Sequence, residues 1–153
     1  MRNKISLLLL GFILMTFMGP RGGQSQPAPE ELPDIKLREI TFRVREIQSS
    51  PSPLKILEIY VEVLNKSRRM AAPPNSVKAV LSQKEVVFED PKPADEFTLT
   101  PQEANLSVPL PPLTGRVLVF GITLPKEKIE SITFEIQVNP PDGDRKTVKW
   151  EER

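Results

Sequence analysis

The chain of 153 residues carries 21 basic and 20 acidic side chains and contains neither cysteine nor histidine. Without these two residue types the usual zinc, copper, haem and iron–sulfur ligand sets cannot form, and Ser-His-Asp and Cys-His catalysis are excluded. A near-neutral chain also lacks the positive field that binds phosphate backbones or anionic lipid, so nucleic acid and membrane surfaces are poor partners on this count.

The chain begins with the pattern of a secretory signal peptide. Two basic residues precede an apolar run over residues 5–18, and Gly23 with Ser25 forms a small-x-small cleavage site. As a helix the run would span roughly 21 Å, short of the ~30 Å hydrocarbon core of a bilayer. We therefore expect residues 1–25 to be removed, after forming a helix that makes no packed contacts with the rest of the chain.

The predicted export indicates a location outside the cytoplasm. An exported chain without cysteine fits a bacterial periplasmic or secreted protein better than a small animal extracellular domain, which usually carries disulfides. After cleavage no membrane insertion is expected. The alternative is a membrane-anchored protein held by an uncleaved N-terminal helix, because Arg21 follows the apolar run closely.

Two further segments follow the signal peptide. Residues 26–34 are polar and spaced by prolines, which predicts an extended linker. Residues 35–153 have the common size of one domain and are numerous enough to bury a core without disulfides.

Period-two alternation predicts the first two strands of this domain. The earlier pair Ile35 and Leu37 has the opposite parity to the residues after it, which indicates a bulge near residues 38–39. The apolar faces are Ile40, Phe42 and Val44 in the first strand, and Leu57, Ile59, Val61 and Val63 in the second.

The outward faces of these two strands carry opposite charges. Their short connection predicts antiparallel neighbours. Arg43 and Arg45 should then form ion pairs with Glu58 and Glu62 across the ladder, rather than being offered to an acidic partner.

Shorter apolar patterns predict the remaining strands. The run 117–124 is nearly continuous, which suits a central strand covered on both faces, with Gly121 at a bulge or a close backbone approach. The other predicted strands are residues 77–81, 86–88 after a turn at 83–84, 97–99 and 106–110 around Pro101, 132–138, and 148–150 after a turn at 140–144.

Seven to nine short strands without a convincing amphipathic helix define the expected fold class. It is all-β, an immunoglobulin-like two-sheet antiparallel sandwich preceded by a signal-peptide helix. The core is expected to contain Phe42, Ile59, Val61, Val119, Phe134 and Ile136.

Two segments carry a family resemblance. Residues 59–67, a strand followed by Asn-Lys-Ser, resemble the strand and Asn-x-Ser turn of bacterial immunoglobulin-like domains of the telokin-like extracellular and cell-adhesion-related types. Residues 112–125 resemble their hairpin of Gly-containing turn, apolar strand and closing proline, with Thr114-Gly115 in place of the more usual Pro-Gly. The resemblance implies a secreted β-sandwich with a binding or scaffolding role and brings no catalytic residues.

Two places are candidates for binding a partner. Tyr60 is the one aromatic residue expected to face outward in a clear strand, where it could anchor a partner or pack over the stems of Arg43 or Arg45. Arg68, Arg69 and Met70 form a basic loop with an apolar tip, which could bind a partner or simply be solvated.

Acidic residues suggest two further roles, one in glycoside hydrolysis and one in calcium binding. Glu58 and Glu62 share a strand face but stand about 13 Å apart, too far for either glycosidase geometry. Asp142 and Asp144 could contribute oxygens to calcium or belong to an ordinary Asp-Gly turn, and both interpretations stay open.

No catalytic, cofactor-binding or metal-binding residue is therefore assigned. The sequence predicts a non-enzymatic exported interaction or accessory module of the bacterial cell envelope that binds an unknown protein or glycan. The alternative is a carboxylate-dependent hydrolase.

Overall fold

The computed structural model describes residues 32–49, 51–90 and 97–153. The expectations for the signal peptide, its helix and residues 26–31 of the linker lie outside this range. Within the range there is no helix that could cross a membrane. Seven strands are present: β1 (Ile35–Ile47), β2 (Leu54–Asn65), β3 (Lys78–Phe88), β4 (Gln102–Asn105), β5 (Gly115–Thr123), β6 (Ile129–Val138) and β7 (Arg145–Glu151).

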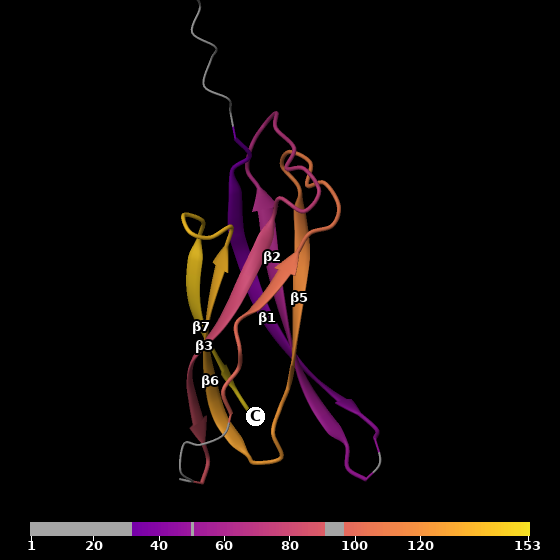
Figure 1. Ribbon diagram of the computed structural model, residues 1–153, viewed down its shortest axis with the longest axis vertical. Coiled ribbons are helices and arrows are strands. Elements are labelled where there is room, and N and C mark those ends of the chain that lie inside the picture. Colours follow the sequence, from indigo (N-terminus) through magenta and orange to yellow (C-terminus); the bar gives the residue numbers. More distant parts are fainter. Residues whose placement is uncertain (1–31, 50, 91–96) are drawn as a thin grey trace, which may run out of the picture. The chain divides into compact units, whose positions relative to one another are not determined.

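The strands form two antiparallel sheets, in the orders β1-β2-β5 and β4-β3-β6-β7 (Figure 1). Side chains from both sheets build one hydrophobic core. The expected all-β class, the two-sheet arrangement and the strand number are thus confirmed. Residues 31–153 form a compact unit that contains this core, so we expect them to fold without the preceding residues.

The pairing of β1 with β2 follows the sequence pattern closely. The register shifts between Leu37 and Glu39, which is the expected bulge. Arg45 forms an ion pair with Glu58, with Nε 3.0 Å from Oε1, so the predicted cross-strand neutralisation is confirmed there. Glu62 instead pairs with Arg38, at 3.1 Å from Nη1 to Oε1. Arg43 forms an ion pair with neither glutamate, so the prediction is wrong for this residue.

Four of the six residues expected in the core belong to it, and a fifth packs against it. Ile59, Val61, Phe134 and Ile136 are fully buried. Phe42 is partly buried, with its ring centroid 6.3 Å from that of Phe134.

Val119 was expected in the core, and that prediction is wrong because β5 is the edge strand of its sheet rather than a central one. Its side chains alternate, so Leu118, Phe120 and Ile122 are buried while Val119 is 49% exposed. Gly121 lies at neither a bulge nor a close approach, since the β2–β5 register is unbroken.

The predicted turn at residues 83–84 is also wrong. β3 continues through it as one strand, with a register irregularity between Gln83 and Glu85 against β6. The bulge turns Gln83 to the neighbouring segment, where its amide donates to Phe97 O at 2.8 Å and accepts from Leu99 N at 2.9 Å. Residues 97–99 are held by this side chain instead of forming the expected strand.

The strand expected at residues 106–110 is absent from the described structure. The segment preceding it forms the short strand β4, and Leu110 makes an isolated bridge with Ala72. Prolines at 109, 111 and 112 lack the N–H that a ladder requires. The apolar residues here pack the loop rather than pair in a sheet.

The last hairpin, β6 to β7, is confirmed, with Gln137 opposite Arg145. Gly143 is required in its turn, because a Cβ at this position would overlap the carbonyl group of Val138. β6 begins at Ile129.

Candidate functional site

Two loops leave the same end of the sandwich and connect its two sheets. We call residues 66–77, between β2 and β3, together with residues 106–114, between β4 and β5, the loop end. Ala72 and Leu110 exchange backbone hydrogen bonds of 2.9 Å in both directions. Asn75 N donates to Leu106 O at 2.8 Å, so the two loops are joined at more than one point.

Asn65, the last residue of β2, fastens both loops to the sheet. Its side chain is fully buried. The amide Nδ2 donates to Met70 O at 2.8 Å and to Leu110 O at 3.0 Å, while Oδ1 accepts from Ser67 N at 3.0 Å. Its backbone N–H and C=O also bond to the 106–114 loop. Both amide donors are used, as burial of a polar side chain requires.

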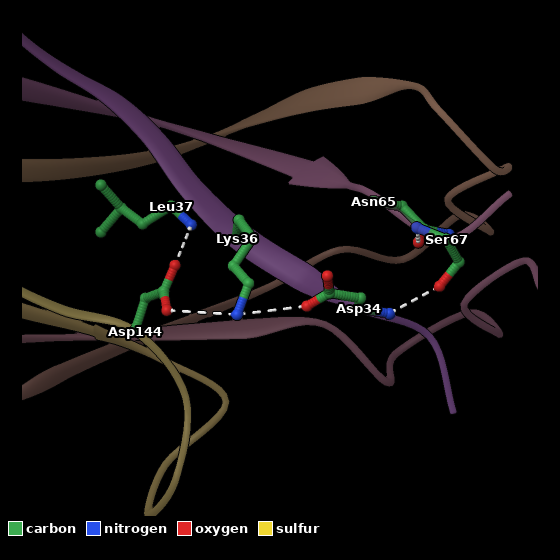
Figure 2. A network of polar contacts seen from close by, with 6 residues as sticks. All are labelled: Asp34, Lys36, Leu37, Asn65, Ser67 and Asp144. Atoms are coloured by element: carbon green, nitrogen blue, oxygen red, sulfur yellow. Dashed lines mark hydrogen bonds and ion pairs between the residues drawn. The ribbon is translucent and has the colours of Figure 1, made fainter. Parts of the chain in front are cut away.

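The polar network continues from Ser67 to the start of β1 (Figure 2). Asp34 N donates to Ser67 Oγ at 2.7 Å, and Lys66 N donates to Asp34 O at 2.7 Å. Lys36 Nζ lies 3.2 Å from Asp34 Oδ1. The chain therefore enters the domain beside the loop end.

Asp144 joins the β6–β7 turn to the same strand (Figure 2). Its Oδ2 accepts from Leu37 N at 3.0 Å, and its Oδ1 lies 3.7 Å from Lys36 Nζ. The hydrogen bond to Asp34 and the charge of Asp144 raise the pKa of Lys36. In the described part of the chain no three acidic side chains come together as a metal site would require. Asp144 thus acts as a structural link between β1 and the turn.

The loop end is basic and partly apolar at its surface. Lys66, Arg68 and Arg69 are exposed, and residues 66–77 and 106–116 contain no acidic residue. Met70, Val108 and Leu113 are exposed apolar side chains. Sequence reasoning selected Arg68, Arg69 and Met70 but missed Val108 and Leu113, because only the folded chain brings the two loops together.

Leu113 has an unusual backbone. Its φ is 57°, in the left-handed region that non-glycine residues seldom occupy, while its side chain is 65% exposed. The hydrogen bond from Leu113 N to Asn65 O, 2.9 Å long, helps to hold it there. Strained residues of this kind cluster at binding sites, where the surrounding structure fixes them.

Tyr60 lies elsewhere, on the outer face of the β1-β2-β5 sheet. Tyr60 lies five positions before Asn65 along β2, roughly 17 Å at 3.3 Å per residue, so it is not part of the loop end. Its hydroxyl donates to Glu58 Oε2 at 2.7 Å. This hydrogen bond and desolvation raise the pKa of Tyr60, while the nearby charge of Arg43 partly opposes them. A partner-binding role for Tyr60 stays a prediction.

Two adjoining grooves occupy the opposite end of the sandwich, with volumes of about 450 and 710 Å³. Both are lined by Lys55 and Glu152, whose ion pair of 2.8 Å raises the pKa of Lys55. Glu58 and Glu62, the carboxylates considered for hydrolysis, line neither groove and are paired with arginines. The grooves therefore present no acid–base pair from that prediction.

No protein-family model matches the chain, and no curated protein matches it. Among solved structures, a similar chain is the X-ray structure of Northeast Structural Genomics Consortium target SoR45. It is 10% identical, the match covers 78% of this chain and 87% of that chain, and the TM-score is 0.41. A likeness at this level supports no conclusion about family or function.

We predict that Asn65→Ala lowers the free energy of unfolding by about 3 kcal/mol, because it leaves the carbonyl of Met70 and the N–H of Ser67 without partners and removes one of the two hydrogen bonds to Leu110 O. Urea unfolding measures the change. The matched control is Asn105→Ala, at an exposed position, with an expected change within about 0.5 kcal/mol. Equal effects of the two substitutions would contradict the role given to Asn65.

The titration of Tyr60 can be followed directly, since it is the one tyrosine of the chain. Ultraviolet absorbance of tyrosinate should show a pKa above the usual value of tyrosine, and Glu58→Gln should lower it. Because the pKa of Tyr60 is higher in the folded than in the unfolded state, the group stabilises the folded state at pH values below the unfolded pKa. This contribution to stability is lost as pH rises through the folded-state pKa. Glu62→Gln, on the same face, is the control and should leave the titration unchanged. A pKa insensitive to Glu58→Gln would show that the hydrogen bond does not form.

Proposed function

We propose that the protein is a non-enzymatic interaction module, exported to the bacterial periplasm or cell surface, that binds a protein or glycan partner through the loop end. A scaffold of seven strands supports loops with exposed basic and apolar side chains, an arrangement on which binding residues are commonly placed. The export itself rests on the signal-peptide pattern of residues 1–25.

We also infer that the sandwich is immunoglobulin-like. In that fold strands A, B and E share one sheet and C, F and G the other, and variable-type domains add a strand beside C. The orders β1-β2-β5 and β4-β3-β6-β7 fit this scheme, with β4 as the added strand. The 66–77 loop then corresponds to the B–C loop, which binds antigen in variable domains, although fold analogy alone assigns no function.

The basic character of the loop end is the observation that carries the proposal. Arg68 and Arg69 are exposed on loops that contain no acidic residue, and Asn65 fixes the loops that present them. Met70 and Leu113 supply apolar contact area beside the charges. A fixed surface of this composition complements a partner that is acidic and partly apolar, and a fixed loop loses little entropy on binding.

The test compares two variants of residues 26–153 in capturing partners from an envelope extract. Arg68→Glu with Arg69→Glu reverses two charges at the loop end. Lys126→Glu with Arg153→Glu reverses two exposed charges beside the grooves at the opposite end, so both variants change the net charge equally. The loop variant should capture at least about tenfold less of a partner that the parent retains, a loss of about 1.4 kcal/mol.

The groove variant should capture that partner as the parent does. Loss of capture by the groove variant alone would move the binding site to the opposite end. A parent that retains no specific partner would overturn the proposed function.

A further inference from the structure

The two sheets have four edge strands, and three of them carry features that block pairing with another chain. β1 contains a bulge, and its exposed residues include five charged ones: Arg38, Glu39, Arg43, Arg45 and Glu46. β4 has only four residues. β7 has seven residues, of which Arg145, Lys146, Lys149 and Glu151 are charged and exposed. Bulges, short length and charges are the usual means by which sheets avoid edge-to-edge association.

β5 has no bulge, is not short, and carries one charged residue, Arg116, next to its first residue. It has nine residues in an unbroken register with β2. The two strands lie side by side in Figure 1. From Val117 to Leu124 no residue is charged, and the nearest prolines, Pro112 and Pro125, lie outside the strand. On its outer face Val117 is 50% and Val119 49% exposed. Within the described chain, the backbone of β5 forms hydrogen bonds with β2 and with no other segment.

We propose that β5 pairs antiparallel with β5 of a second copy of this chain, which joins two three-stranded sheets into one of six strands. The pairing that overlaps all nine residues places Val119 on the two-fold axis, opposite Val119 of the second copy. Val117 then lies opposite Gly121 of the second copy. An isologous contact of this kind closes with two subunits, as most soluble homo-oligomers do.

The side chains of β5 suit this pairing with themselves. Space is open over Gly121, because the nearest atom to an added Cβ would be Ile56 Cγ2 at 3.8 Å. Val117 of the second copy can occupy it and cover apolar surface on both chains. With no charge between residues 117 and 124, no like charges face each other across the axis.

A second copy fits this edge better than the other described strands do. A strand added here must carry few charges and many β-branched or aromatic residues over about nine positions, which are the features that favour strand pairing. β5 meets that requirement itself, whereas β1 and β7 would bring three or more exposed charges to the contact. The two loop ends would point in opposite directions from an antiparallel pair, so both remain open to partners.

A single-cysteine crosslink tests the proposed axis. The chain has no cysteine, so Val119→Cys introduces one thiol. Residues directly opposite in an antiparallel pair have Cα atoms about 4.5–5.5 Å apart, within the range of a disulfide. In residues 26–153 under mild oxidation, Val119→Cys should become a disulfide-linked dimer at least about tenfold faster than Val44→Cys, a rate ratio equivalent to 1.4 kcal/mol. Val44 is 43% exposed on β1, the other edge of the same sheet.

Sedimentation equilibrium supplies the second measurement. Val119→Lys places two positive charges opposite each other at the axis. It should raise the dissociation constant of the dimer at least about tenfold, whereas Val44→Lys should leave it unchanged. A parent that remains monomeric at protein concentrations up to about 1 mM would overturn the proposal, because a dissociation constant above that value is too high for a specific dimer. So would equal effects at Val119 and Val44. Neither result would affect partner capture by the loop end, which tests the proposed function separately.

Discussion

The buried side-chain amide of Asn65 is the contact on which the arrangement of the loop end depends. The chain passes from the first sheet to the second between β2 and β3, and it returns between β4 and β5. Asn65 hydrogen-bonds to both of these connections at once, through Met70 O and Leu110 O. A single residue therefore fixes the two crossovers relative to each other. An amide suits the place because it has two donors for the carbonyls and an acceptor for Ser67 N.

Other polar side chains also link separate parts of the domain. Asp144 joins the β6–β7 turn to β1, and Gln83 holds residues 97–99 against β3. Lys55 and Glu152 join the sheets at the opposite end. The chain contains no cysteine, so no disulfide adds to these links. The core supplies most of the stability, and the links define how loops and edges lie.

Sequence periodicity predicted the parts of the fold in which one face is buried and the other is wet. β2 alternates from Ile56 onward and β6 from Ile132 onward, and the change of parity at Leu37 gave the bulge correctly. β5 was misjudged because Val117 and Val119 are apolar although they face solvent, so composition concealed an ordinary alternation. The segment 97–110 was misjudged because its backbone is held by Gln83 and Ala72, whose positions depend on tertiary structure. Likewise, the basic loop was visible in the sequence, but its apposition to Leu113 was not.

The hydrogen bonds of the Asn65 side chain should make the loop end as well ordered as the sheets. Native-state hydrogen exchange of the backbone N–H groups of Ser67, Ala72 and Leu110, compared with that of Val61 in the core, tests it most directly. We expect the three loop groups to open with a free energy within about 1 kcal/mol of that of Val61, because they exchange only when the whole domain unfolds. Exchange of these groups at the rate of an exposed loop would contradict it.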